Sequence, residues 1–405
     1  MRLFVFFTFF LITKMASAEF FQDISGIIKN NEERLSYGIS VTDFNKDGQF
    51  EFIVTGFRHP NLALSYKKGF LENLINEEVF SDDIRSTIGV AACDIDNDGF
   101  EELYFLNTDT YSGRKQYSDR LLDSQTKIID LFEIEKNLKS LNLTAGRSVV
   151  CVDRNGVGTY GFYVANYGGP TRFYELINNQ IIDKAPMLNI DKITGGRAVV
   201  SGHILGDQMD IFAANERGPN FLYFNEDGVF KDFAEKLGVE DVFENGRGTT
   251  LTDFLYRGEL DIVTGNWEGE HRIFLKGDKK FKDVATSAFK TPSRVRTVIS
   301  ADFDNDGYDE IFINNIGEAN KFKSEEMRDQ YFEAMKDTTP DDVRKNMKNE
   351  NANFQMNWNN EKNDMVMYCW WKANSPQAIL DTLGDMAGMF HNDIKEMSNV
   401  MDVTD

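Results

Sequence analysis

The chain has 405 residues, 41% of them hydrophobic, which is enough for one large domain or for two to three ordinary ones with buried cores. Its formal net charge of −22 repels nucleic acid and anionic membranes and attracts cations, so it argues against nucleic-acid partners. The four histidines are scattered and the three cysteines have no metal-ligand spacing, which argues against a zinc centre.

The N-terminus is typical of an export signal. Arg2 supplies a short positive region, and the apolar stretch over residues 3–13 is too short to span a bilayer. The Ala-Ser-Ala step at residues 16–18 fits the cleavage rule, so we predict a signal peptide over residues 1–18 and a mature start at Glu19. The alternatives are an uncleaved anchor or a buried first strand. The expected location is secreted, periplasmic or cell-surface, with no membrane insertion.

A repeat with a period near 50 residues occupies most of the chain. Its clearest copies are three acidic loops, of which "DFDNDGYDEIFINN" at Asp302–Asn315 is one. Three weaker copies lie between them, and an arginine precedes the first loop position by six residues in four of the six copies. The first loop positions are Asp43, Asp94, Asp153, His203, Asp253 and Asp302, and the arginines are Arg147, Arg197, Arg247 and Arg296.

Each copy predicts four short strands. A β-branched strand precedes the loop, an apolar strand follows it, and Gly/Pro/Asn turns lead to a third strand and to a short fourth strand such as Phe230–Ala234. Four-stranded units of roughly 40–50 residues are the sequence mark of a β-propeller. We therefore predict an all-β propeller over residues 19–322, with six blades, or seven if the C-terminal tail donates one. Phe20–Ser25 resembles the fourth strand and is predicted to close the ring by completing the last blade.

The repeat pattern ends after Lys323. Residues 323–405 predict the order helix, strand, strand, helix, strand, and Thr339 is a plausible N-cap of a helix that starts at Pro340. We predict a separate small α/β domain, ferredoxin-like with its first strand missing or borrowed.

The three acidic loops place oxygen donors at alternate positions around a glycine turn. Positions 1, 3, 5 and 9 carry side-chain oxygens, the glycine at position 6 permits a tight bend, and the residue at position 7 can offer a backbone carbonyl. The predicted metal ligands are Asp43, Asn45, Asp47, Gln49 and Glu51 in the first loop, Asp94, Asp96, Asp98, Phe100 and Glu102 in the second, and Asp302, Asp304, Asp306, Tyr308 and Glu310 in the third.

Such a donor set suits a hard cation with six to eight oxygen ligands, which favours Ca²⁺ over Mg²⁺. An EF-hand is excluded, because position 12 is Val54, Phe105 or Ile313 in strand-like runs instead of a bidentate glutamate. The alternative is a solvated turn, since Asp, Asn and Gly are ordinary turn residues. The same donor positions in three loops favour the metal interpretation.

The weaker copies lack this donor set. In the fifth copy Arg257 replaces the position-5 ligand, where its guanidinium could stand in for a cation between Asp253 and Asp261. In the third copy position 5 is Val157. We therefore predict about three Ca²⁺ ions with a structural role.

The cysteines and the repeated arginines give weaker signals. Cys93 and Cys151 lie in strand-like runs and are predicted to be small core residues, because an odd, sparse set of cysteines does not form a disulfide framework. Each repeated arginine could bind an anion at the centre of the ring, or could pair with a carboxylate of the neighbouring blade or with a turn. We favour the structural interpretation.

Together these motifs resemble a known family. "DFDNDGYDEIFINN" and "DIDNDGFEELYF" resemble the FG-GAP/VCBS repeats of integrin α-subunit propellers, and "GRSVVCVDRNGVGTYGFYVANYGGP" resembles the cartilage acidic protein family and its bacterial relatives. The resemblance covers about residues 20–322 and implies a calcium-loaded propeller in a secreted or surface protein used for adhesion or recognition. Propellers of that family often have seven blades, and its usual C-terminal domain is not recognisable here.

Three functions are compatible with the sequence. The first is a non-enzymatic, calcium-stabilised scaffold that binds an extracellular protein or glycan. The second is a carbohydrate-binding, lectin-like propeller, which exposed aromatics such as Tyr167 and Trp267 would favour. The third is a hydrolase or lyase that uses clustered carboxylates. No nucleophile elbow, phosphate loop or zinc cluster is recognisable, so we favour the first.

Overall fold

The computed structural model describes residues 24–124, 127–316, 321–322, 325–336, 338–358 and 368–391. The predicted signal peptide lies outside these residues, as does most of the predicted closing strand Phe20–Ser25. From Ile28 the chain forms a parallel bridge to Leu71 in the first sheet. The first described residues therefore contact the first sheet, and closure of the ring by the preceding segment remains a prediction.

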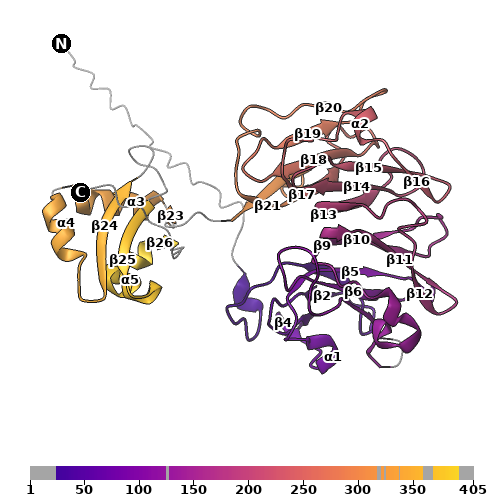
Figure 1. The fold of residues 1–405 in the computed structure, drawn as a ribbon, viewed down its shortest axis with the longest axis horizontal. Helices are drawn as coiled ribbons and strands as arrows, with labels where there is room; N and C mark the ends of the chain where they lie inside the picture. The colour runs from indigo at the N-terminus through magenta and orange to yellow at the C-terminus, as the bar shows by residue number, and fades with distance from the viewer. Residues whose placement is uncertain are drawn as a thin grey trace, which may run out of the picture.

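Residues 24–316 form successive antiparallel sheets (Figure 1). The first sheet contains β1 (Ile39–Thr42), β2 (Glu51–Val54), β3 (Leu62–Lys67) and β4 (Phe70–Asn73), and the second contains β5 (Thr87–Cys93), β6 (Glu102–Asn107), β7 (Arg120–Asp123) and β8 (Ile129–Asp130). The third contains β9 (Gly146–Val152), β10 (Gly161–Pro170), β11 (Arg172–Ile177) and β12 (Gln180–Asp183), and the fourth contains β13 (Ile193–Gly202), β14 (Asp210–Asn215), β15 (Phe221–Glu226) and β16 (Val229–Asp232).

The last two sheets differ in size. The fifth contains β17 (Gly246–Thr252), β18 (Asp261–Asn266), β19 (Arg272–Leu275) and β20 (Lys282–Asp283), and the sixth contains β21 (Val295–Ala301) and β22 (Glu310–Asn315). The third and fourth sheets are joined where β10 pairs with β13. Short helices lie in the connections: α1 (Glu78–Ser81), α2 (Ala234–Leu237), and the 3₁₀ turns η1 (Ser25–Ile27), η2 (Leu131–Glu133) and η3 (Glu135–Ser140).

The core lies between consecutive sheets, as the face-to-face stacking of propeller blades requires. In β6, Leu103 and Phe105 pack against the first sheet, whereas Tyr104 and Leu106 pack against the third. Further hydrophobic clusters join the third sheet to the fourth, the fourth to the fifth, and the fifth to the sixth. Because both faces of the central sheets are buried, all six residues of β6 are buried and the strand is almost continuously apolar.

The all-β fold is therefore confirmed, and five of the six predicted repeats form the expected four-stranded sheet within the described residues. The sixth forms two strands there, so the number of blades in the complete ring remains a prediction.

The C-terminal residues form α3 (Glu325–Met335), α4 (Pro340–Asn346), β24 (Ala352–Trp358), β25 (Tyr368–Ala373), α5 (Pro376–Leu383), the 3₁₀ turn η4 (Gly384–Met389) and β26 (Phe390–His391). Thr339 caps α4 as predicted, accepting a hydrogen bond from the Asp342 amide. β24 pairs with β25, while β23 (Lys321–Phe322) pairs with β26. The predicted last strand, beyond residue 391, lies outside the described residues. A ferredoxin-like fold and a boundary at residue 322 therefore remain predictions.

Candidate metal centres

Each predicted metal loop connects the first strand of a sheet to the second, and its backbone is held by its own first aspartate. Asp43 Oδ1 accepts a hydrogen bond from the Asp47 amide at 3.0 Å, and Asp43 Oδ2 accepts one from Gly48 at 2.8 Å. Asp94 and Asp302 accept the equivalent two bonds. The tight turn requires positive φ at position 4, where Lys46, Asn97 and Asn305 lie near 60°, and at the glycine of position 6.

The loop backbone brings three of the four predicted carboxylates together in the second loop and in the third, leaving out Asp98 and Glu310. In the second loop Asp94, Asp96 and Glu102 each place an oxygen within 4.8 Å of the others, and in the third loop Asp302, Asp304 and Asp306 do the same. In the first loop Asp43 and Asn45 both accept from the Asp47 amide, at 3.0 and 2.9 Å, so their side-chain oxygens also converge.

The remaining predicted ligands are also held in the loops. The amide of the position-7 residue donates to the carboxylate at position 5, at 2.9 Å for Gln49, 2.8 Å for Phe100 and 2.9 Å for Tyr308. The position-9 carboxylates Glu51, Glu102 and Glu310 accept the amide of position 2, at 3.1, 2.9 and 2.9 Å.

In the second loop the crowded carboxylates have raised pKa values. Burial, followed by repulsion from Asp96 and Asp123, raises the pKa of Glu102 to about 8. Burial, followed by repulsion from Asp98 and Asp94, also raises the pKa of Asp96. The ionised loop is therefore unfavourable by itself, and a cation among the oxygens would reverse the sign of these interactions. A donor set made entirely of oxygens fits a hard cation such as Ca²⁺.

The weaker copies keep the loop shape without the donor set. Asp253 accepts hydrogen bonds from the Arg257 and Gly258 amides at 2.9 and 2.6 Å. The Arg257 guanidinium forms an ion pair with Asp261 at 2.8 Å, so it stands beside the position-9 carboxylate as a built-in cation. In the third copy Asp153 holds Gly156 and Gly158 in the same way, at 2.8 and 2.6 Å. Loop geometry alone therefore does not identify a metal site.

The prediction for two cysteines was wrong. Cys93 at the end of β5 and Cys151 in β9 form a disulfide that joins the first strands of the second and third sheets. Both residues stand within two positions of the first loop aspartate in consecutive repeats, Asp94 and Asp153. The repeat alignment itself therefore placed them side by side, and this signal could have predicted the bond.

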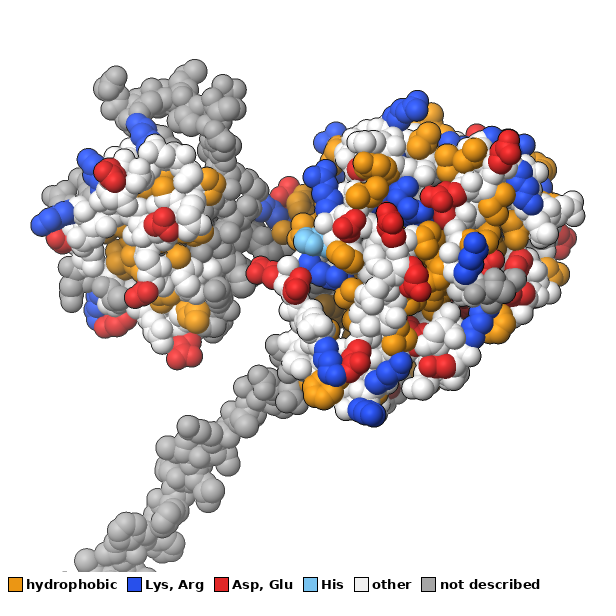
Figure 2. Space-filling view, turned by 90° about the horizontal axis from the view of Figure 1, so that it is seen from below, with side chains coloured by type: hydrophobic (Ala, Val, Ile, Leu, Met, Phe, Trp, Pro, Cys, Tyr) orange, Lys and Arg blue, Asp and Glu red, His pale blue; other side chains and the backbone are white. Residues whose placement is uncertain are grey.

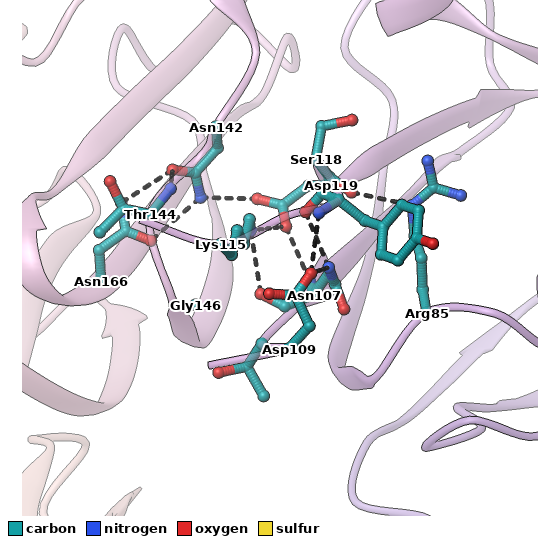
Figure 3. Close-up of polar contacts among 12 residues, drawn as sticks. Arg85, Asn107, Asp109, Lys115, Ser118, Asp119, Asn142, Thr144, Gly146 and Asn166 are labelled. Atoms are coloured by element: carbon teal, nitrogen blue, oxygen red, sulfur yellow. Dashed lines mark hydrogen bonds and ion pairs between the residues drawn. The ribbon is translucent and has the colours of Figure 1, made fainter. Parts of the chain in front are cut away.

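Sequence reasoning also missed a buried polar network in the connection between β6 and β7 (Figure 3). Lys115 and Asp119 form an ion pair with no exposed side-chain surface. Asp119 also accepts hydrogen bonds from Tyr104 Oη at 2.7 Å and from Asn142 Nδ2 at 2.6 Å, and Lys115 Nζ donates to the Asn107 carbonyl at 2.9 Å. This connection accounts for the longest step between repeats, 59 residues from Asp94 to Asp153.

Comparison with known proteins identifies similar repeats and similar chains. Residues 253–313 match the FG-GAP-like repeat. Cartilage acidic protein 1 is 46% identical in Xenopus tropicalis and 44% in Homo sapiens, each over 318 aligned residues that cover 71% of this chain and 49% or 48% of the relative. The predicted resemblance is confirmed. The chain spans about half the length of these curated relatives, so their full activity is not transferred to it.

Solved structures show more distant likenesses. The Dos1 propeller aligns with a TM-score of 0.44 at 12% identity, covering 71% of each chain. The Vibrio cholerae biofilm matrix protein Bap1 aligns with a TM-score of 0.38 at 15% identity, covering 63% of this chain and 40% of that one.

Two further observations concern the distribution of surface charge and the character of the helices. Figure 2 shows acidic and basic side chains interspersed with hydrophobic ones on the face it draws, without a uniformly basic area there. Among the described residues, no helix combines the length and apolar character that crossing a membrane requires.

Proposed function

We propose that this protein is an exported, calcium-stabilised β-propeller that acts as a non-enzymatic scaffold for adhesion or recognition. The observation that carries the proposal is the convergence of three oxygen donors in both the second and the third acidic loops. Sequence identity of 44–46% to cartilage acidic protein 1 supports a related role, and neither relative is named as an enzyme.

Export is supported by the disulfide as well as by the predicted signal. Structural disulfides persist in oxidising compartments and are rare in the cytosol. Cys93 is 2% exposed and the disulfide joins two sheets. The disulfide is therefore positioned to act as a structural crosslink. These features favour a secreted, periplasmic or cell-surface protein.

The lectin-like alternative depends on exposed aromatic rings, and the two rings that it named are partly covered. Tyr167 is 9% exposed instead of presenting a free face, and the guanidinium of Arg197 lies 4.6 Å from its ring centre. The Trp267 ring is likewise contacted by Arg247 at 4.7 Å. Neither ring therefore presents both faces to a sugar, and the scaffold function remains the better supported of the two.

The test is to count metal ions and melt the protein with and without a chelator. We expect about three Ca²⁺ per chain by elemental analysis after dialysis, and a large drop in melting temperature when EGTA is added. Asp96→Asn and Asp304→Asn should each lower the count by one. The matched control is Asp253→Asn, which changes a loop without the donor set and should leave the count unchanged. A melt indifferent to EGTA, with no bound Ca²⁺, would refute the metal assignment.

A further inference from the structure

The repeated arginines occupy a special position in the backbone. Strand pairing between the first and second strands skips one residue in the third, fifth and sixth sheets, and the skipped residues are Arg147, Arg247 and Arg296. In the fourth sheet the skip spans Arg197 and its neighbour Ala198. Such β-bulges redirect a side chain away from the regular alternation of the strand. Four consecutive sheets therefore aim an arginine by the same backbone device.

The equivalent positions lie next to one another from sheet to sheet. Arg147 is repelled by Arg197 and Arg247, and Arg247 by Arg197 and Arg296. Arg296 also lies 5.7 Å from the ring centre of Tyr37, which stands six positions before the first loop of the first repeat. The arginine cluster, defined as Arg147, Arg197, Arg247 and Arg296, thus gathers at the start of the first strands.

The cluster is not electrically balanced. Glu216 pairs with Arg197, whose Nε lies 2.6 Å away, and with Arg247 at 3.3 Å. Arg147 instead donates to neutral oxygens, including the Gly146 carbonyl at 2.8 Å, and within the described part of the chain no carboxylate pairs with Arg296. Four guanidiniums and one paired carboxylate leave three positive charges in a protein whose net charge is −22. The structural interpretation thus accounts for Glu216 and its two partners, and leaves the other charges unexplained.

Two donor atoms in the cluster lack acceptors. The Nε atoms of Arg147 and Arg247 are buried and have no hydrogen-bond partner among the described residues. Burial and repulsion from Arg197 lower the pKa of both guanidiniums to about 10, so both stay charged at neutral pH. A buried donor left unsatisfied is unfavourable, and an oxyanion would supply both the acceptors and the missing negative charge.

Aromatic rings hold the guanidiniums in place. Arg147 lies 5.7 Å from the ring centre of Tyr111 and 5.3 Å from that of Tyr167, and Arg247 lies 4.7 Å from that of Trp267. Such contacts fix the orientation of a guanidinium and reduce the entropy lost when a ligand binds. The cluster is therefore preorganised.

The network of Figure 3 contributes to this arrangement. Figure 3 draws the buried Lys115–Asp119 pair, and Tyr111 belongs to the same connection between β6 and β7. From there its carbonyl accepts a hydrogen bond from Arg147, and its ring packs against Tyr167 with the ring centres 5.2 Å apart. Tyr111 is 62% exposed, so the surface next to Arg147 remains accessible.

We propose that the arginine cluster is a binding site for an oxyanion, either a carboxylate or a sulfate group of a ligand, with Arg147, Arg247 and Arg296 as its donors. The site lies at the opposite end of the first strands from the acidic loops. Six residues of extended chain separate the two positions, a distance of roughly 20 Å. The anion site and the metal loops can therefore be tested independently.

The experiment is calorimetric titration of the full chain, in the presence of Ca²⁺, with sodium sulfate and with sodium acetate. Sodium chloride at matched ionic strength measures nonspecific effects. We expect saturable binding of at least one of the two oxyanions, weakened roughly tenfold or more by Arg247→Gln, because a charge-assisted hydrogen bond is lost. Lys279→Gln, which removes one charge from an exposed turn, should leave the affinity unchanged.

A second variant guards against misfolding. Arg296 pairs with no carboxylate in the described part of the chain, so Arg296→Gln removes a donor without leaving an acidic partner unpaired. It should weaken binding while the melting temperature stays close to that of the parent. Heats of sulfate and acetate no larger than those of chloride, or equal affinity in the parent and both arginine variants, would overturn the assignment.

Discussion

The disulfide between Cys93 and Cys151 closes a loop with a sequence separation of 58 residues. Replacing both cysteines with alanine removes that constraint from the unfolded chain, and alanine avoids placing a hydroxyl in the buried site of Cys93. In the chain-entropy model a loop of this length corresponds to about 4 kcal/mol of stability at 25 °C. We therefore expect the free energy of unfolding to fall by about that amount.

The assay is urea unfolding followed by tryptophan fluorescence, with Ca²⁺ held constant. Reduction of the parent protein should lower its stability to a similar extent, and the double variant should be insensitive to reductant. Cys369→Ser is the control, because Cys369 is free, and its sensitivity to reductant should match that of the parent.

A count of free thiols tests whether the Cys93–Cys151 disulfide is present. The denatured, unreduced parent should show one titratable thiol and the reduced protein three, because the chain has three cysteines. Three thiols without reduction would refute the crosslink. A double variant as stable as the oxidised parent would instead show that the loop-entropy estimate does not apply to this fold.

Three further predictions concern single side chains. His271 Nδ1 accepts the Asn266 amide at 3.0 Å and burial lowers its pKa below 6.5, so its contribution to stability is present above pH 6.5 and is lost as the pH falls through its folded-state pKa. His271→Asn should weaken this acid sensitivity in melts between pH 7.5 and 5, because Asn61 and Asn220 accept the equivalent amide in other sheets; an unchanged pH profile would contradict it. A Cβ at Gly248 would lie 2.6 Å from the Val298 amide nitrogen, so Gly248→Ala should destabilise by about 1–3 kcal/mol in urea unfolding, whereas Gly218→Ala, in open space, should not. Lys115→Met leaves Asp119 buried without its ion-pair partner and should cost about 3–5 kcal/mol by the same assay, whereas breaking the half-exposed Lys231–Glu226 pair with Lys231→Met should cost about 0–1 kcal/mol; similar losses would refute the burial argument.

The repeats and the converging carboxylates of the loops could be predicted from sequence because they are local. An Asp, Asn and Gly pattern over nine residues determines the turn, and alternating apolar strands determine the sheets. Asp94, Asp96 and Glu102 were predicted from spacing alone, and the structure brings all three together.

The features that sequence reasoning missed depend on contacts between repeats. The Lys115–Asp119 pair lies in a connection without a counterpart in the other copies, so no periodicity predicts that it is buried. The lectin-like alternative required an exposed Tyr167, but arginines from two sheets lie against its ring. Neither outcome follows from local propensity, because both are set by which sheets become neighbours.

The carboxylate at position 9 holds the loop even in a copy that lacks the full donor set. In the fifth copy Asp261 still accepts the Phe254 amide at 3.3 Å. Glu51 and Glu102 make the same bond in loops that have the full donor set. The position-9 residue therefore holds the loop with and without the full donor set, whereas positions 3 and 5, which also accept loop amides in the acidic loops, carry other residues in the fifth copy. In the fifth copy Arg257 stands at position 5, and its guanidinium pairs with the position-9 carboxylate of Asp261.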